Sequence, residues 1–234
     1  MKFEITDKTK TVGNIVFYQI KAIKSFGNVK AGDIGGWLEK EENLSNINDA
    51  WVYDDAQVSG NAQVFGNAQV FDYARVFDNA WVSGDAWVYD DAQVYDNARV
   101  SGNVRVGGNA RVSGNVRVSG NAQVYGNAQV SGDTQVSGNA RVGGNALVYG
   151  DVLVKTPVIN LISSAQFNVT AFCNSVVIGC KIHTVKKWEE IFKQGTYKKL
   201  CSDDLAYEQC RLAFEFCKKT LIYNQRNGDT NEIS

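Results

Sequence analysis

Residues 49–66, DAWVYDDAQVSGNAQVFG, contain three copies of one six-residue unit, and the same unit continues to Val154. Valine occupies every sixth position from Val52 to Val154, which gives eighteen valines in one register. The residue two places before each valine is small, usually alanine, and the residue four places before it is glycine or aspartate in nearly every unit. Self-similarity at a short fixed period is typical of a solenoid, in which each repeat buries its apolar side against its neighbours.

A six-residue unit has room for one short strand and one turn, so three units closing a triangle form an eighteen-residue coil. Residues 48–155 then form about six coils, and the resulting prism is about 29 Å long at the usual spacing between neighbouring strands. Valine and alanine fill the thin interior, while aspartate, asparagine and glycine take the corners, where turn geometry favours them. We therefore expect a mostly β fold with three parts: an N-terminal β cap (1–47), the repeat (48–155) and a C-terminal α+β domain (156–234).

Composition excludes several classes of function. The formal net charge is −1, which does not indicate nucleic-acid binding. The first ten residues have no apolar segment, and no run reaches the roughly 18 apolar residues of a membrane span, so we expect a cytoplasmic protein without membrane contact. All five cysteines lie between Cys173 and Cys217, which indicates reduced, buried thiols rather than a secreted disulfide framework.

The N-terminal 47 residues predict a cap on the solenoid. Apolar and polar residues alternate from Ile15 to Ile20 after a Gly13-Asn14 turn signal, which predicts a strand or hairpin. The glycine cluster at 32–36 lacks the Lys-Ser/Thr of a phosphate-binding loop. We interpret it instead as a turn that places Trp37 and Leu38 on the open end of the first coil, because an uncovered terminal coil is an unpaired sheet edge.

The C-terminal region begins where Pro157, the chain's one proline, ends the repeat. Residues 167–173 and 176–182 predict a hairpin. Thr184 is expected to cap a short helix that ends at Gly195, and Ser202 to cap a longer one. The apolar face of the longer helix is predicted to consist of Leu205, Ala206, Cys210, Ala213, Phe214, Cys217 and Leu221.

The period and residue types resemble the hexapeptide-repeat proteins, whose coils form a left-handed parallel β-helix. The segments GDIGGWLE (32–39), NLS (43–45) and WVY (51–53), with the tail around 172–180, are similar to a group of these proteins common in bacteriophages and prophages. The resemblance implies the left-handed β-helix fold and a homotrimer. It implies little about function, since acyltransferase activity in the group rests on analogy of fold.

The acyltransferase interpretation can be compared with the residues. Hexapeptide acyltransferases typically use a histidine base beside a loop extruded from a coil, and zinc hydratases of this fold use three histidines. Here the repeat has no histidine and no insertion, His183 lies beyond it, and no glutamate occurs between Glu42 and Glu189. We therefore expect no catalytic residues, no cofactor and no enzyme activity, with an acyltransferase kept as the third hypothesis.

Residues eighteen apart stack in columns, so the outer surface can be mapped. One column contains Trp51, Gln69 and Trp87 in its first three coils, and the column beside it contains Tyr53, Phe71 and Tyr89. An exposed apolar patch usually marks an interface, although the N-terminal segment or a neighbouring subunit could also cover these rings. The predicted partner-binding residues are Trp51, Tyr53, Phe71, Trp87 and Tyr89.

Charges are sorted along the repeat. Aspartates form corner columns in the early coils (Asp54, Asp72, Asp90; Asp78, Asp96), where turn geometry explains them, although stacked carboxylates could also hold calcium. Arginines follow later in a belt that winds round all three faces, and Arg99 is placed next to Trp81 for a cation–π contact. The candidates for binding a small anion are Arg99, Arg105, Arg111 and Arg117.

Cys180 and His183 have a C-x-x-H spacing. With Cys173 or Cys201 they could form a zinc site or a Cys-His nucleophile pair. The alternative is a buried thiol near an ordinary histidine, and without a second closely spaced pair we assign no metal site.

These observations favour a non-enzymatic, phage-type binding protein that contacts a host protein, including a defence factor that it would inhibit. The alternative is capture of a small anionic ligand, such as a nucleotide signal, at the arginines or at subunit clefts.

Overall fold

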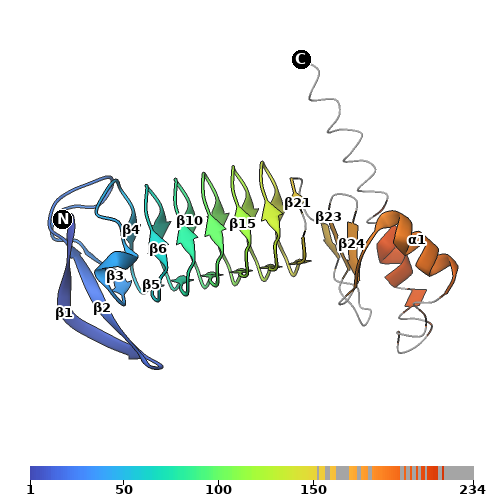
Figure 1. Cartoon of the computed structure of the whole chain (residues 1–234), viewed down its shortest axis with the longest axis horizontal. Coiled ribbons are helices and arrows are strands. Elements are labelled where there is room, and N and C mark those ends of the chain that lie inside the picture. Colours follow the sequence, from blue (N-terminus) through green and yellow to red (C-terminus); the bar gives the residue numbers. More distant parts are fainter. Residues whose placement is uncertain are drawn as a thin grey trace, which may run out of the picture.

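The computed structural model describes residues 1–151, 153–155, 159–161, 169–172, 175–178 and 181–195, together with positions 198, 201, 204, 207, 208, 210–215 and 218. Over this part of the chain the fold is mostly β, and a parallel solenoid of six coils forms the body of the molecule (Figure 1). The predicted parallel β-helix of about six coils is therefore confirmed.

Each coil contributes one two-residue strand to each of three parallel sheets, which we call faces I, II and III. Face I consists of β4 (Trp51–Val52), β7 (Gln69–Val70), β10 (Trp87–Val88), β13 (Arg105–Val106), β16 (Gln123–Val124) and β19 (Arg141–Val142). Face II consists of β5 (Gln57–Val58), β8 (Arg75–Val76), β11 (Gln93–Val94), β14 (Arg111–Val112), β17 (Gln129–Val130) and β20 (Leu147–Val148). Face III consists of β6 (Gln63–Val64), β9 (Trp81–Val82), β12 (Arg99–Val100), β15 (Arg117–Val118), β18 (Gln135–Val136) and β21 (Leu153–Val154).

Residues eighteen apart are direct neighbours in these sheets. Trp87 pairs with Arg105, and Val88 pairs with Val106. The backbone ladder follows the same spacing, since the Gln57 N–H donates to the Ala74 carbonyl at 2.9 Å. The predicted columns are therefore real columns on the surface.

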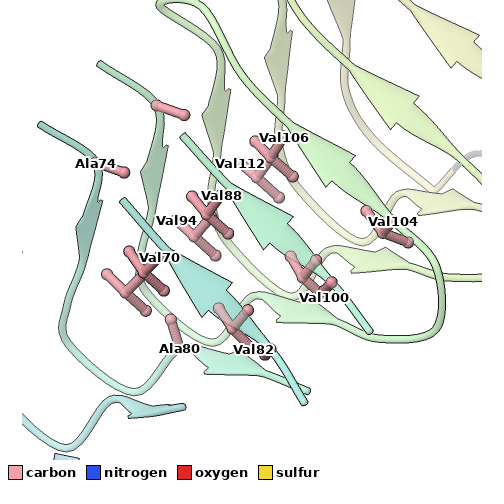
Figure 2. Packing of buried hydrophobic residues seen from close by; sticks show 14 of the residues in the cluster. Val70, Ala74, Ala80, Val82, Val88, Val94, Val100, Val104, Val106 and Val112 are labelled. Carbon is pink, nitrogen blue, oxygen red and sulfur yellow. The ribbon is translucent and has the colours of Figure 1, made fainter. Parts of the chain in front are cut away.

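The interior is a stack of valine and alanine side chains (Figure 2). The repeat valines are buried, and so are Val104 and Val116, which replace alanine. Thr134 is also buried at an alanine position, and its hydroxyl donates to the Ser131 carbonyl at 2.7 Å. Burial of each valine contributes roughly 1.5–3 kcal/mol, so the regular core dominates the stability of the solenoid.

The corners explain the glycine and aspartate of the repeat. All eighteen residues four places before a repeat valine have positive φ, from Asn48 (59°) to Gly150 (90°). Glycine adopts this conformation without strain, and aspartate and asparagine tolerate it better than most residues. The aspartates also bond to the next coil, because the Asp90 carboxylate accepts a hydrogen bond from the Gly108 N–H at 2.8 Å.

The next corner residue, usually asparagine, forms ladders along the prism. The Asn97 side-chain amide donates to the Asn115 carbonyl oxygen at 3.2 Å, and Asn115 donates in turn to Asp133 at 2.8 Å. Similar bonds join Asn103 to Asn121 and Asn109 to Asn127. The exposed edges are thus held by amide chains that run parallel to the axis.

A β cap covers the first coil. β1 (Phe3–Val12) and β2 (Ile15–Ala22) form an antiparallel hairpin, and β3 (Ile34–Leu38) pairs with β2 and, in parallel, with β5. Face II therefore continues into a nine-stranded sheet. The predicted hairpin and the delivery of Trp37 and Leu38 to the first coil are confirmed, and a Cβ on Gly36 would lie 2.7 Å from the Tyr53 carbonyl oxygen.

The cap satisfies the carbonyl groups that the first coil presents without a preceding coil. On face I the Lys2 ammonium donates to the Ala50 carbonyl at 2.6 Å. On face II the Trp37 N–H donates to the Ala56 carbonyl at 2.9 Å. On face III, Asn43 of the 3₁₀ helix η1 (Glu41–Asn43) donates its side-chain amide to the Ala62 carbonyl at 2.8 Å.

A four-stranded antiparallel sheet lies beyond the solenoid. Its strands are β22 (Ile159–Leu161), β23 (Val169–Phe172), β24 (Ser175–Ile178) and β25 (Lys181–Thr184). The predicted hairpin is present as β23 and β24, but the expected strand 176–182 is divided, because β24 ends at Ile178 and β25 begins at Lys181. The predicted Thr184 cap is confirmed, since its hydroxyl accepts from the Lys187 N–H at the start of α1 (Val185–Lys193), and Gly195 follows the helix with φ +65°.

Residues 210–215 belong to a second helical segment that packs on this sheet and on α1. Cys210 and Phe214 are buried in a cluster with Trp188, as predicted for the apolar face. Several predicted positions lie outside the described residues. They are the helix cap Ser202, the boundary residue Pro157, and four residues of the predicted apolar face: Leu205, Ala206, Cys217 and Leu221.

Candidate interaction surface

Face I carries four rings on its first three coils: Tyr53, Phe71, Trp87 and Tyr89. Trp87 is 40% exposed, and the other three are partly exposed. The Phe71 ring stacks on Tyr89 with centroids 5.5 Å apart and meets Trp87 edge-on at 5.8 Å. We call these four residues the face I aromatic surface.

Trp51 is not part of this surface, and the prediction that it is exposed was wrong. Its side chain is 0% exposed because Phe3 and Phe26 of the cap cover it, with ring centroids 6.3 and 5.4 Å away. A Cβ on Gly35 would lie 2.6 Å from the Trp51 ring, so the glycine allows β3 to approach it closely. The sequence left open that the N-terminal segment covers the aromatic residues of these columns. The structure shows such cover for Trp51.

A shallow hollow of about 240 Å³ lies on face I between Phe71, Trp87, Tyr89 and Arg105. The Arg105 guanidinium lies over the Trp87 ring, 5.2 Å from its centroid. A second hollow beside it is lined by Asp85, Trp87, Asn103 and Arg105. Apolar rings next to charged and amide groups are typical of a surface that binds a protein.

Tyr89 and Tyr125 lie in the column that contains Tyr53 and Phe71. Each of their rings lies along the prism axis over a glycine of the next coil. A Cβ on Gly107 would lie 2.3 Å from the Tyr89 ring, and a Cβ on Gly143 would meet the Tyr125 ring at the same distance. The glycines therefore make room for flat-lying rings. A glycine follows both Tyr89 and Tyr125 by eighteen residues, and this spacing could have indicated the contact, which we did not predict.

Face III carries a second aromatic group, formed by Phe65 and Trp81. Their ring centroids are 6.0 Å apart, and Trp81 is 41% exposed. With Glu42 and Ser45 of the cap they line a hollow of about 400 Å³. Arg99 lies 4.8 Å from the Trp81 centroid, which confirms the predicted cation–π contact. Sequence reasoning missed Phe65 and Glu42, because aromatic columns were listed only for face I and Glu42 belongs to the cap, which has no repeat.

The arginine belt winds round the solenoid as predicted. Arg99 and Arg117 pair on face III, while Arg105 lies on face I and Arg111 on face II. The four guanidinium groups therefore do not converge on one site. Arg117 also lines a polar hollow whose other charged members are Asp133 and Asp151, so carboxylates oppose an anion there.

The corner aspartates, considered above for calcium, bond to the backbone. Asp54 accepts from the Asp72 N–H at 3.4 Å, Asp72 from the Asp90 N–H at 3.1 Å, and Asp78 from the Asp96 N–H at 3.3 Å. Within the described residues, no group of three or more His, Cys, Asp or Glu side chains is placed to hold a metal ion. The carboxylate columns have a structural explanation in the corner turns.

His183 lies in β25 and meets the Trp188 ring edge-on at 5.1 Å. Of its predicted partners in a metal or nucleophile site, Cys173 and Cys180 lie outside the described residues, and Cys201 is a partly buried thiol. Cys210 is buried, and desolvation of its thiolate together with the neighbouring Cys201 raises the pKa of its thiol to about 11. Such a thiol is almost fully protonated at neutral pH and is therefore a poor nucleophile.

Comparisons with known proteins agree with the repeat architecture. Residues 56–72, 92–108, 110–126, 122–138 and 134–150 match the YdcK beta solenoid repeat model. A segment of 44 residues is 41% identical to the uncharacterized acetyltransferase YdcK of Escherichia coli (strain K12), which corresponds to 19% of this chain and 14% of that protein. In the part of the chain that the structure describes, no helix is long and apolar enough to cross a membrane. The chain is thus a β-solenoid repeat protein, and five segments of its repeat match the YdcK beta solenoid repeat model.

Proposed function

We propose that this chain is a non-enzymatic binding protein that acts through the aromatic side chains of its first coils. The observation that carries the proposal is the pair Trp81 and Trp87, which are 41% and 40% exposed on a rigid solenoid. Each tryptophan lies under an arginine of the next coil. Tryptophan and arginine are the residues most enriched at the energetic centres of protein interfaces.

The partner proposed is a host protein in the cytoplasm, including a defence factor that the chain would inhibit by covering its surface. This setting rests on the resemblance to phage and prophage repeat proteins. A prism of uniform coils suits such a role, because it holds its side chains in place without ordering a loop on binding.

The proposal is tested by capturing partners from a bacterial lysate with the wild-type chain and with Trp81→Ala and Trp87→Ala. We expect a specific partner whose recovery falls at least tenfold with one of the two variants, since truncation of a central tryptophan costs about 2 kcal/mol or more. Arg141→Ala, on the late coils, serves as the control. Recovery that none of these substitutions changes would contradict a role for the aromatic side chains.

Capture of a small anionic ligand is the second candidate, favoured by Arg105 beside the rings of Phe71, Trp87 and Tyr89. A planar anion such as a nucleotide could stack on a ring and pair with the guanidinium. A thermal-shift screen with nucleotides distinguishes the candidates, because ligand at a hundred times its dissociation constant adds roughly 2.7 kcal/mol of stability.

An acetyltransferase is the third candidate, because YdcK carries that name. That protein matches a segment of 44 residues, 19% of this chain, and the one histidine of the sequence, His183, lies in β25 beyond the repeat. We expect no acetyl transfer when the chain is incubated with acetyl-coenzyme A and amine acceptors and the products are followed by mass spectrometry. Turnover would replace the binding proposal with an enzymatic one.

A further inference from the structure

The outward residues of face I form a column that is complementary to its own reverse. From the first coil to the sixth the order is Trp51, Gln69, Trp87, Arg105, Gln123 and Arg141. A second copy running antiparallel, with its first coil beside the sixth, places Trp87 opposite Arg105 and Gln69 opposite Gln123. The first pair joins a ring to a guanidinium, and the second joins two amides that can donate and accept.

The two edges of face I show the same complementarity. At the corner that follows face I, reversal places Asp91 opposite Asn109 and Asp55 opposite Asn145. At the corner that precedes it, Asp85 comes opposite Asn103. In this register each of these carboxylates meets an amide that can donate a hydrogen bond to it, and none meets another carboxylate.

Neither of the other two faces has this property. On face III the same reversal places Arg99 opposite Arg117, which brings like charges together. On face II it places Arg75 opposite Gln129 and Arg111 opposite Gln93, so neither arginine gains an aromatic or acidic partner. The pattern therefore distinguishes one face of three that share the same backbone.

The direction of the second copy is also specified. Two copies of face I related by an axis along the solenoid would place each coil opposite its equivalent, and Arg105 would meet Arg105. Like charges in direct opposition cost free energy. The antiparallel direction replaces this contact with Arg105 against Trp87, twice, around one two-fold axis.

We propose that face I is the interface of an antiparallel homodimer, with its two-fold axis between β10 and β13. This proposal rests on the proposed function in treating the aromatic side chains as a protein-binding surface. It assigns those of face I to a second copy and leaves the hollow of Phe65 and Trp81 on face III for an outside partner. The resemblance to hexapeptide-repeat proteins implies a trimer instead, so the mass of the assembly separates the two.

Five of the six coils of face I are free of the cap, which covers Trp51 on the first coil. At about 4.8 Å per coil and a width of five residues at about 3.3 Å, these five coils cover roughly 400 Å² on each copy. The total of roughly 800 Å² lies at the small end of interface sizes, so we expect a weak dimer that dissociates on dilution. Because face I is preformed by the solenoid, association does not require its backbone to order.

Light scattering after gel filtration gives the first test. We expect the purified chain to have twice the 25.7 kDa of one chain, and Trp87→Arg to be monomeric, because it opposes Arg105. Trp81→Arg on face III is the matched control: Trp81 has the same exposure and also lies under an arginine, yet it should leave the dimer intact. A wild-type monomer or trimer, or a dimer lost with Trp81→Arg and retained with Trp87→Arg, overturns the proposal.

The exchange of both residues, Trp87→Arg with Arg105→Trp, tests the register. It restores a ring opposite a guanidinium across the axis, so we expect the dimer to return. A double variant that stays monomeric while folded by circular dichroism contradicts the pairing.

The direction is tested with Gln69→Cys and Gln123→Cys, prepared separately and mixed under mild oxidation. We expect a disulfide-linked dimer from the mixture and little from either variant alone, beyond the background of the wild-type cysteines. Efficient linkage of Gln69→Cys to itself would show a parallel pair and reject the model. A monomeric chain that still captures a host partner through Trp81 would refute the dimer but not the proposed function. A dimer that captures no partner would refute the proposed function but not the dimer.

Discussion

Lys2 supplies hydrogen bonds that a preceding coil would otherwise donate to the first coil. Its side chain is 1% exposed, and its ammonium donates to the carbonyl groups of Ala50 and Asn48 at 2.6 and 3.0 Å. Burial lowers the pKa of Lys2 to about 8, although the charge of Asp49 partly opposes this. Between pH 8 and 10.5 the Lys2 side chain is therefore mostly protonated in the unfolded chain and mostly deprotonated in the folded chain.

Unfolding in this pH range takes up a proton, so the free energy of unfolding should rise as pH rises. We expect a rise of at most about 3 kcal/mol, observed as an increase in the urea midpoint from pH 7 to 9.5. Lys2→Met should remove most of this rise, and a smaller slope should remain from Lys10, whose pKa is also lowered by burial. Lys30→Met, at an exposed position, should keep the full rise, and an unchanged slope in Lys2→Met would refute the assignment.

The corner glycines allow a test of backbone conformation separate from packing. Gly120 has φ +73°, a region that alanine occupies at a cost of about 1–2 kcal/mol and aspartate at a lower cost. Asp72 and Asp90 occupy the same place in the six-residue unit, at another corner of the prism, with carboxylates that accept from the next coil. We therefore expect Gly120→Ala to lower the urea midpoint more than Gly120→Asp. The opposite order would mean that crowding by Gly138, not φ, decides the residue at this corner.

The N-terminal cap is the element that pairs with the first coil, which has no preceding coil. Asn43 in η1 is buried and donates to the carbonyl groups of Gly60 and Ala62 at 3.2 and 2.8 Å. Asn43→Asp removes this donor and places an oxygen against two carbonyl oxygens. We expect a loss of roughly 1–3 kcal/mol, measured by urea unfolding.

The control is the same change at an exposed ladder residue, Asn97→Asp. Its side chain faces solvent, and water can replace the lost donor, so we expect a change within about 0.5 kcal/mol. Equal losses at both positions would contradict a capping role for Asn43.

The sequence predicted most elements because their period is a direct result of packing. Val88 and Ala86 had to point inward in a coil of eighteen residues, whatever the rest of the chain did. The β24–β25 division at 178–181 follows no such period, and the predicted strand 176–182 missed it. The residue at which one short strand ends depends on tertiary pairing that local pattern does not specify.

For the molecule as a whole, the surface columns could be predicted from the sequence. Which residues of a column are buried by the N-terminal cap could not. Trp51 and Trp87 occupy the same column, and the approach of Phe3 and Phe26 decides that the first is buried and the second exposed. That approach depends on the path of the cap, which has no repeat. The Lys2 contacts were unpredictable for the same reason, since they join residues 48 positions apart.

The charge distribution is a second whole-molecule property. Aspartates dominate the early coils and arginines the late ones, so two antiparallel solenoids would place opposite halves side by side. We expect added salt to weaken association of the purified chain, since screening acts on exposed charges about 10 Å apart at 0.1 M. Sedimentation at 0.05 and 0.5 M sodium chloride measures this, and association that strengthens with salt would indicate that apolar contact dominates.

The uniform core has a consequence for how this protein can change. Any unit of six residues with a small fourth residue and valine as its sixth fits the interior, so the stability of the solenoid depends on a residue's position modulo six. The surface depends on position modulo eighteen. Copying 59–64 once after Val100 should preserve stability in urea while it moves Arg105 from face I to face II and Arg117 onto face I. A duplication of one, two or three six-residue units should therefore be neutral for folding. Only the duplication of three units, which adds a whole coil, keeps every later residue on its original face.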